Sequence, residues 1–305
     1  IKSSGRPIAQ CYKITAYAAT PLVKLHNRQR INYTIRNTGG IRHVFTIGVI
    51  ADDHLVFNDK VMLAPGEKKS VMHNMLATKP GFQHITIGNA NIAYKVYENN
   101  KESLLLDLSP VNNHNDTLVS DKSGFGNNGH IVFLADHTKT PEDKLLFGTS
   151  CFDALPSSPS LDELGETITM MAWVYPTGSN NGLTDIFTKG DTNVLQVAGG
   201  KSLTFFAGGW GRGDCTVDLP PDWLNHWHHI AGVCEGKVLH VYIDGILKGS
   251  TTTDQSTGLS VNNKWVLGRN DEFPSEREFQ GYIANVKIYK EPLSAAEVLA
   301  IFNID

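Results

Sequence analysis

Short runs of alternating apolar and polar residues dominate the first hundred positions of the chain. In RINYTIRNTGG, the apolar side chains of Ile31, Tyr33 and Ile35 recur at every second position, and the run ends at two glycines. A period of two is typical of a strand that buries one face. Similar runs, separated by Gly, Pro, Asn and Asp, are HVFTIGVIADDH, VMLAPGEKKSVMHNM, GFQHITIGN and NIAYKVYE. About six or seven strands are therefore predicted, and an immunoglobulin-like β-sandwich is the simplest architecture for them.

A polar stretch without periodicity, YENNKES, follows these strands. We place a domain boundary there, so that residues 1–99 form the immunoglobulin-like sandwich and residues 100–305 form a second domain. The second domain is again rich in strand-like runs, and its length of about 200 residues favours a two-sheet jelly roll. At its end, Ser294 precedes Glu297 by three positions in LSAAEVLAIFN, which is the spacing of a helix capping box. The prediction is an all-β chain closed by one short helix.

The stretch NHWHHIAGVCEGKVLHVYIDG predicts two successive hairpins. Residues 227–234 form one strand and residues 238–243 the next, with Glu235 and Gly236 as the turn between them. Asp244 and Gly245 then provide the residue types of a type I′ turn. The turn residues thus mark three strands within a short stretch.

Three histidines occupy the first strand of this stretch. Side chains alternate along a strand, so His229 lies on one face while His226 and His228 lie on the other. A zinc site needs three or four ligands that converge on one point. We therefore expect a packed, hydrogen-bonded His229 and more exposed His226 and His228, rather than a metal centre.

Sequence motifs in both regions resemble known families. The turns in NTGG, LAPGE and GFQHITIGN are similar to those of small β-sandwich modules that flank catalytic domains in bacterial glycoside hydrolases, and of CARDB-type adhesion modules. Four segments of the second region resemble the laminin-G-like, concanavalin A-like jelly roll of bacterial extracellular proteins: DKSGFGNNGHI, ITMMAWVYP, WHHIAGVCEGKVLHVYIDG and FQGYIANVKIYKEPLSAAEV. This resemblance implies the non-catalytic region of a larger extracytoplasmic protein, a glycoside hydrolase of the β-galactosidase type.

Calcium is the cofactor that the second resemblance implies. Asp121 and the carbonyl groups near Gly126 and Asn127 stand where such domains hold the ion, and calcium prefers oxygen ligands of this kind. The family pattern reads I-D-E-V where this chain has Ile283-Ala284-Asn285-Val286, so one carboxylate is missing. The calcium site is therefore predicted to be weakened or absent.

Composition narrows the possible partners. The chain has 305 residues, 41% of them hydrophobic, and a net charge of −4. With no block of like charges, we expect neither a nucleic-acid partner nor a polybasic membrane surface. No apolar run approaches the roughly 20 residues that span a bilayer. Because the sequence begins at Ile1 without an initiator Met or a signal peptide, we expect it to be a piece of a longer, processed protein.

Four cysteines, Cys11, Cys151, Cys215 and Cys234, lie far apart in the sequence. They form neither the paired pattern of a zinc site nor a dense disulfide framework. One bridge between Cys215 and Cys234 and free buried thiols both remain open.

No catalytic motif emerges from the sequence. Glucanases of the concanavalin A-like fold resemble one another in an E-x-D-x-E strand, which places two carboxylates on one face. The nearest stretch, LDELGE over residues 161–166, lacks that spacing and contains Gly165, so it indicates a loop or a helical turn. The P-loop, nucleophile-elbow and dinucleotide fingerprints are also missing from the sequence. This region is therefore predicted not to be an enzyme.

The segment GGWGRGDC carries the preferred functional candidate. Trp210 is flanked by glycines, where an aromatic ring would be partly exposed, and exposed aromatic rings stack on the apolar faces of sugars. The hydroxyl groups of a sugar would be bound by polar neighbours, for which the candidates are Arg212, Asp214, Asp185 and Asn181. A structural tryptophan that caps the sandwich edge is the alternative. Arg212-Gly213-Asp214 also matches the tripeptide that integrins bind, a match that arises often by chance.

The sequence thus predicts that the chain binds glycan and positions the catalytic domain of a parent glycoside hydrolase outside the cytoplasm. Its partners would be an oligo- or polysaccharide and the adjacent domains of the same chain. Two alternatives remain: a structural spacer without a ligand, in which Trp210 is buried against the first domain, and a protein-adhesion module with an exposed apolar patch.

Overall fold

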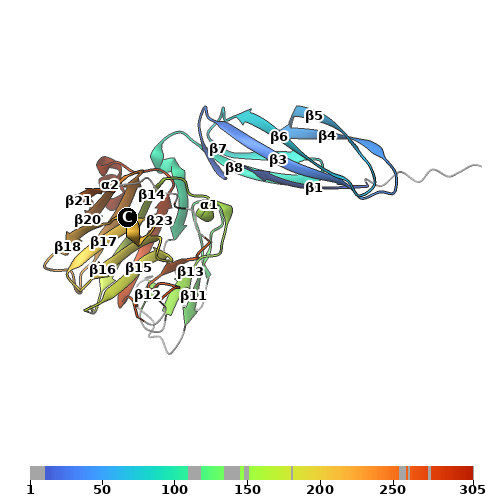
Figure 1. Ribbon diagram of the computed structural model, residues 1–305. Helices are drawn as coiled ribbons and strands as arrows, with labels where there is room; N and C mark the ends of the chain where they lie inside the picture. Colours follow the sequence, from blue (N-terminus) through green and yellow to red (C-terminus); the bar gives the residue numbers. More distant parts are fainter. Residues whose placement is uncertain are drawn as a thin grey trace, which may run out of the picture. The chain divides into compact units, whose positions relative to one another are not determined.

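The structure is a computed structural model that describes residues 11–108, 118–133, 145–147, 151–179, 181–253, 259, 262–273 and 276–304. The chain divides into two compact units, Ile1–Asn99 and Asn100–Asp305 (Figure 1). In these ranges no helix is long and apolar enough to cross a membrane.

The first unit is a sandwich of two β-sheets. One sheet has the order β1-β3-β6 and the other β2-β8-β7-β4-β5. The strands are β1 (Tyr12–Ala18), β2 (Leu22–Lys24), β3 (Arg28–Asn37), β4 (His43–Ala51), β5 (His54–Leu63), β6 (Lys68–Leu76), β7 (Gly81–Ile87) and β8 (Ala90–Tyr97). These eight strands exceed the predicted six or seven, because β2 is too short to give an alternating pattern.

The core of the first unit lies between its two sheets. Ile31, Tyr33 and Ile35 of β3 are at most 1% exposed, as their alternation predicted. The Tyr33 hydroxyl donates a 2.6 Å hydrogen bond to Asp59 of β5, and His73 Nε2 of β6 lies 2.8 Å from the same carboxylate. Burial and the adjacent Asp59 carboxylate raise the pKa of Tyr33. Asp59 therefore links the two sheets through polar contacts.

The second unit contains the remaining elements (Figure 1). Its helical segments are η1 (Asn100–Ser103), α1 (Pro159–Asp162), η2 (Trp210–Arg212) and α2 (Ala295–Phe302). Its strands are β9 (Leu104–Leu108), β10 (Leu118–Val119), β11 (Gly129–Phe133), β12 (Leu145–Phe147), β13 (Cys151–Ala154), β14 (Thr167–Pro176), β15 (Leu183–Lys189), β16 (Asn193–Ala198), β17 (Ser202–Ala207), β18 (Cys215–Asp218), β19 (His228–Glu235), β20 (Val238–Ile243), β21 (Ile246–Thr252), β22 (Trp265–Leu267) and β23 (Gly281–Tyr289).

Two large antiparallel sheets pack face to face in this unit. The first has the order β10-β11-β13-β22-β15-β16-β17-β18, and the second has the order β12-β23-β14-β19-β20-β21 with β9 also paired to β23. The sheets approach closely at Gly232 of β19, where a Cβ atom would lie 2.3 Å from the Phe205 ring of β17. The predicted all-β architecture is confirmed.

The double hairpin predicted from the histidine-rich stretch is present. The Asp244-Gly245 turn joins β20 to β21, and both residues have positive φ angles of 52° and 72°, as a type I′ turn requires. The preceding turn is shifted by one position from the prediction. Glu235 still pairs with Val238, so Gly236 and Lys237 form the loop.

The C-terminal helix α2 begins where its capping box predicted. Glu297 N donates to Ser294 Oγ, and Ser294 N donates in return to Glu297 Oε2. Val298 and Ile301 of the helix are buried against β14, β19 and β20. Local sequence therefore specified both the start of this helix and its apolar side.

Cys215 and Cys234 are free buried thiols in the structure, and Cys11 is partly exposed. Burial raises the pKa of Cys234 to about 12, so this thiol is protonated at neutral pH. The alternative of a bridge between Cys215 and Cys234 is wrong.

Candidate functional site

Trp210 stands out on the surface of the second unit. It lies in η2, between β17 and β18, and it is 63% exposed. Its ring and that of Phe206 of β17 pack edge to face, with ring centroids 6.1 Å apart and an interplanar angle of 80°. The expectation of partial exposure is confirmed, and the ring presents a flat apolar surface to solvent.

Three glycines determine the path of this loop. Gly208, Gly209 and Gly213 have φ angles of 90°, 105° and 101°, which side chains other than glycine rarely adopt. The path of the loop that carries Trp210 therefore depends on glycine at these three positions.

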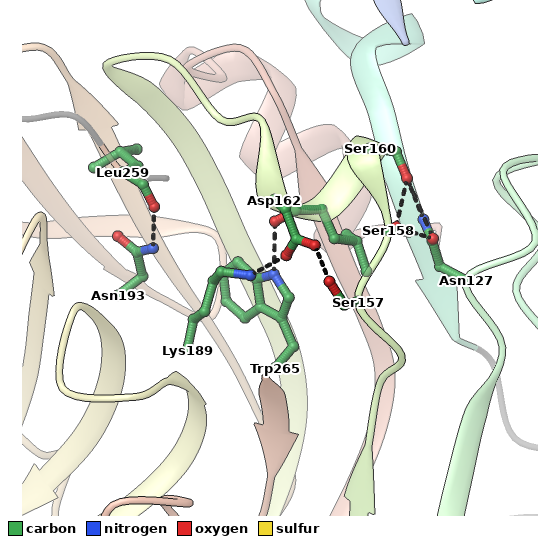
Figure 2. A network of polar contacts seen from close by, with 10 residues as sticks. Asn127, Ser157, Ser158, Ser160, Asp162, Lys189, Asn193, Leu259 and Trp265 are labelled. Carbon is green, nitrogen blue, oxygen red and sulfur yellow. Dashed lines mark hydrogen bonds and ion pairs between the residues drawn. The ribbon is translucent and has the colours of Figure 1, made fainter. Parts of the chain in front are cut away.

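A buried asparagine anchors the same loop to the sheet. Asn193 of β16 is fully buried, its Oδ1 accepts a hydrogen bond from Gly208 N, and its Nδ2 donates to Leu259 O at 3.1 Å (Figure 2). Gly209 N also donates to Thr192 O at 2.9 Å. Because the backbone is already fixed, a ligand that binds Trp210 need not order the loop.

Two predicted polar residues lie on the same loop. Arg212 is exposed, and Asp214 is half-buried at the start of β18, the edge strand of the eight-stranded sheet. Asp214 Oδ2 accepts a 2.6 Å hydrogen bond from the Thr216 hydroxyl. The loop therefore brings one aromatic ring, one guanidinium and one carboxylate together at a sheet edge.

The other two predicted residues do not join this site. β16 pairs with β17 so that Asn193 lies at the Trp210 end, whereas the backbone beside Asn181 contacts Gly199 at the other end of the strand. These two ends are about 16 Å apart at the rise of a β-strand. Asp185, in β15, is completely buried and presents no surface to a ligand. Grouping Asn181 and Asp185 with Trp210 is therefore wrong.

Asp185 belongs to a charged network inside the second unit. Its Oδ2 lies 3.7 Å from Arg277 Nη1, and the same nitrogen donates a 2.9 Å hydrogen bond to Asp191. Arg277 also lies 3.8 Å from the centre of the Phe273 ring. Burial raises the pKa of Asp185 to about 7, although Asn270 and Arg277 oppose that shift. Sequence inspection missed this network because its members come from separate strands and loops.

The Asp121 carboxylate, where the resemblance implies a weakened or absent calcium site, is surrounded by hydrogen-bond donors. Its Oδ1 accepts from the backbone N–H groups of Asp107 and Ser123, both at 2.9 Å. Its Oδ2 accepts from the Ser123 hydroxyl at 2.7 Å and from Asn127 N at 2.9 Å. All four contacts stabilise the loop that follows Asp121.

Asn127 is also engaged by protein groups. It is 1% exposed, and its Nδ2 donates to Leu105 O at 2.8 Å and to Ser160 Oγ at 2.9 Å. Figure 2 shows the Ser158 and Ser160 side chains directed at the same asparagine. Where the structure describes the chain, no group of three or more His, Cys, Asp or Glu residues could hold a metal. As arranged, the Asp121 carboxylate does not fit a calcium ion, because N–H and O–H donors occupy both of its oxygens.

The neighbouring histidines His226, His228 and His229 do not form a metal centre either. His226 is exposed, whereas His228 is 3% exposed, with its Nδ1 3.0 Å from Asp244 Oδ2 and its ring stacked on Trp223. The prediction of an exposed His228 is wrong, because the Asp222–Trp223 segment covers that face of the strand. His229 is buried on the opposite face, where its ring contacts Trp173, as the alternation predicted.

The LDELGE segment contains the end of α1 and the loop that follows it, in agreement with the predicted loop or helical turn. Asp162 at the end of α1 lies 2.5 Å from Lys189 Nζ, and the Lys189 side chain is completely buried beside Trp265 (Figure 2). Burial lowers the pKa of Lys189. Asp162 therefore neutralises a buried lysine.

Comparisons with known proteins agree with this architecture. The sequence profile of the concanavalin A-like lectin/glucanases superfamily matches residues 149–299. No curated protein matches the chain significantly.

Several solved structures share the fold. The binding domain of Paraclostridial Mosquitocidal Protein 1 is 16% identical over 67% of this chain and 53% of that chain, with a TM-score of 0.53. The binding domain of botulinum neurotoxin DC, in complex with SialylT, is 13% identical over 67% of this chain and 52% of that chain, with a TM-score of 0.52. The binding domain of botulinum neurotoxin serotype C1 is 14% identical over 67% of this chain and 53% of that chain, with a TM-score of 0.53. The chain thus spans about half the length of these structures.

Proposed function

We propose that the concanavalin A-like lectin/glucanase domain of this chain binds glycan through the loop that carries Trp210. The chain would be a non-catalytic accessory region of a larger extracytoplasmic glycoside hydrolase of the β-galactosidase type. The observation that carries this proposal is an indole ring that is 63% exposed on a loop anchored by Asn193.

The side chains of the loop suit a sugar ligand. The Trp210 ring can stack on the C–H face of a sugar, while the exposed Arg212 and the half-buried Asp214 can bind its hydroxyl groups. A shallow edge site of this kind binds weakly. Weak binding suffices for a module tethered to an enzyme, because the tether raises the effective concentration of the catalytic domain near the glycan.

The fold gives this proposal limited but independent support. A botulinum neurotoxin binding domain of the same architecture is in complex with SialylT. Asp162 of the LDELGE segment pairs with the buried Lys189, so we do not assign it to a catalytic pair of carboxylates. We therefore assign binding rather than hydrolysis to this region.

A glycan array tests the proposal. The full chain is applied beside three variants, Trp210→Ala, Trp210→Phe and Ile246→Ala, the last being a control at a side chain 57% exposed on β21. We expect the Trp210→Ala signal to fall about tenfold or more, and the Trp210→Phe signal to fall less. The scale is that of a nucleobase stacked on an aromatic side chain, which contributes about 1–3 kcal/mol. An unaltered signal in Trp210→Ala, or an equal loss in Ile246→Ala, would contradict the proposed site.

A protein-adhesion module is the second candidate function, and one observation favours it. The outer face of β4 and β5 exposes two cross-strand apolar pairs, Val44 with Met62 and Ile50 with Leu55, each at least 36% exposed. Exposed apolar patches are typical of protein interfaces. This candidate predicts binding to a protein that no sugar competes for and that Trp210→Ala leaves intact.

A further inference from the structure

The two units carry opposite net charges. Residues 1–99 contain 13 Lys and Arg against 5 Asp and Glu, a net charge of +8. Residues 100–305 contain 14 against 26, a net charge of −12. The overall charge of −4 conceals this asymmetry. The basic unit is therefore the place to look for an anionic ligand.

Positive charge gathers on the outer face of the three-stranded sheet β1-β3-β6. These strands contain no Asp or Glu. Their register aligns Lys13 of β1, Arg36 of β3 and Lys68 of β6 in one row across the sheet. Arg30 and Arg28 lie on the same side of β3, because their side chains are separated from Arg36 by even numbers of residues. We call these five exposed side chains the basic face.

In the part of the chain that the structure describes, the charges of the basic face have no ion-pair partner. None of the salt bridges in the described ranges involves any of its five side chains. The only carboxylate adjacent in sequence, Glu67, accepts a 2.7 Å hydrogen bond from Ala64 N in its own turn. Like charges directly opposite one another destabilise a sheet. A bound polyanion would remove that repulsion.

Groups suited to a sugar lie between the cations. One row across the sheet consists of the hydroxyls of Thr15, Thr34 and Ser70, and Thr34 and Ser70 are hydrogen-bonded at 2.9 Å. The next row contains Tyr17 beside Asn32, and Tyr17 is 59% exposed. The face therefore offers a ring for the apolar side of a sugar, hydroxyl and amide groups for its hydroxyls, and cations for its acidic substituents.

We propose that the basic face binds an acidic polysaccharide, whose carboxylate or sulfate groups pair with its lysines and arginines. Proteins that bind single-stranded nucleic acid use several aromatic rings for successive bases, whereas this face exposes one. The site rests on the first unit alone, and only the choice of a saccharide over nucleic acid rests on the proposed glycan function. The sequence contains no block of like charges, but the strand register assembles on this face cations that are scattered in the sequence.

Binding assays with matched polymers test this proposal on the full chain. The probes are polygalacturonate, dextran sulfate and uncharged dextran, with a single-stranded oligodeoxynucleotide, polyphosphate and phosphatidylserine vesicles as competing anions. The face variant carries three substitutions: Lys13→Gln, Arg36→Gln and Lys68→Gln. The control variant carries the same change in charge at exposed positions outside the face: Arg42→Gln, Lys60→Gln and Lys79→Gln.

We expect the full chain to bind polygalacturonate or dextran sulfate, but not dextran, at low ionic strength. Each cation near an anionic surface contributes about 1 kcal/mol, so the face variant should bind about 100-fold more weakly. The affinity of the control variant should fall by less than about threefold, because its three charges lie outside the face and salt screens their attraction to the polymer. The face variant should fold as well as the full chain, since it relieves like-charge repulsion.

Tyr17→Ala identifies the ligand class. It should weaken binding to polygalacturonate by about threefold or more and leave polyphosphate binding unchanged, because only the first polymer has rings for Tyr17 to contact. Equal losses of affinity in the face and control variants would contradict the basic face as the binding site. If the oligodeoxynucleotide or the vesicles bind more tightly than the polysaccharides, and the face variant loses that binding, the ligand is not a saccharide. Trp210→Ala should alter none of these affinities, so failure here is distinguishable from failure of the proposed function.

Discussion

Two loops of the second unit look alike in sequence and differ in what they do with their polar groups. Both are rich in glycine and contain an aspartate. The loop after Asp121 turns its carboxylate inward, where four protein donors bind it. The loop around Trp210 is held by the buried Asn193 of the neighbouring strand β16, which binds the loop backbone. The side chains of Trp210 and Arg212 therefore remain exposed. We infer that the partners of a polar side chain, rather than its type, separate a structural loop from a binding loop.

The largest expected effect breaks the structural loop. Asp121→Ala leaves four donors without their acceptor, and we expect it to lower the free energy of unfolding of the second unit by about 3 kcal/mol in urea titrations. Asp214→Ala is the matched control, because Asp214 accepts one hydrogen bond from Thr216 and should cost less than about 1 kcal/mol. Equal losses at the two positions would remove the distinction between the loops.

A second prediction concerns Asp185. Its carboxyl group is completely buried, but it is not surrounded by four hydrogen-bond donors as the Asp121 carboxylate is. Burial raises its pKa to about 7, so the folded protein holds a proton that the unfolded chain releases near pH 4. The contribution of the protonated Asp185 to the free energy of unfolding is complete below pH 4 and is lost as the pH rises to about 7, so stability falls with pH between these values. Asp185→Asn should remove this slope and stabilise the protein at pH 8 on the order of 2 kcal/mol. Urea titrations between pH 4 and pH 8 measure the free energy of unfolding of both proteins. The same pH dependence in Asp185→Asn as in the full chain would contradict the prediction.

The smallest expected effect is that of calcium on the structural loop. Because protein donors occupy the Asp121 oxygens, millimolar calcium or a chelator should shift the melting temperature by less than about 1 °C, since only an ion that binds the folded state stabilises it. Differential scanning calorimetry checks this. A calcium-dependent rise in the melting temperature that Asp121→Asn abolishes would show that Asp121 binds calcium, and it would contradict a purely structural role of the loop.

Local patterns predicted the fold well. The type I′ turn at Asp244-Gly245 and the capping box of Ser294 and Glu297 are specified by neighbouring residues, so both were visible in the sequence. The alternation in β3 likewise predicted which side chains are buried.

The site was harder to predict because its geometry is non-local. Asp185 and Asn181 were grouped with Trp210 on residue type alone, whereas the pairing of β16 with β17 places Asn181 at the opposite end of the strand. His228 was expected to be exposed, but Trp223 stacks on it. The basic face escaped notice because its cations come from three strands. Each error concerns which strands and loops become neighbours, which a single sequence does not specify.

The central claim, that Trp210 contacts the glycan, is tested most directly by the indole N–H signals of the full chain in a heteronuclear NMR titration. The chain has five tryptophans, and the signal that disappears in Trp210→Phe identifies Trp210. When the glycan that gives the strongest array signal is added, we predict that the Trp210 signal shifts most and that the signals of the buried Trp223 and Trp265 stay in place. A Trp210 signal that remains unmoved while the glycan binds would contradict the account.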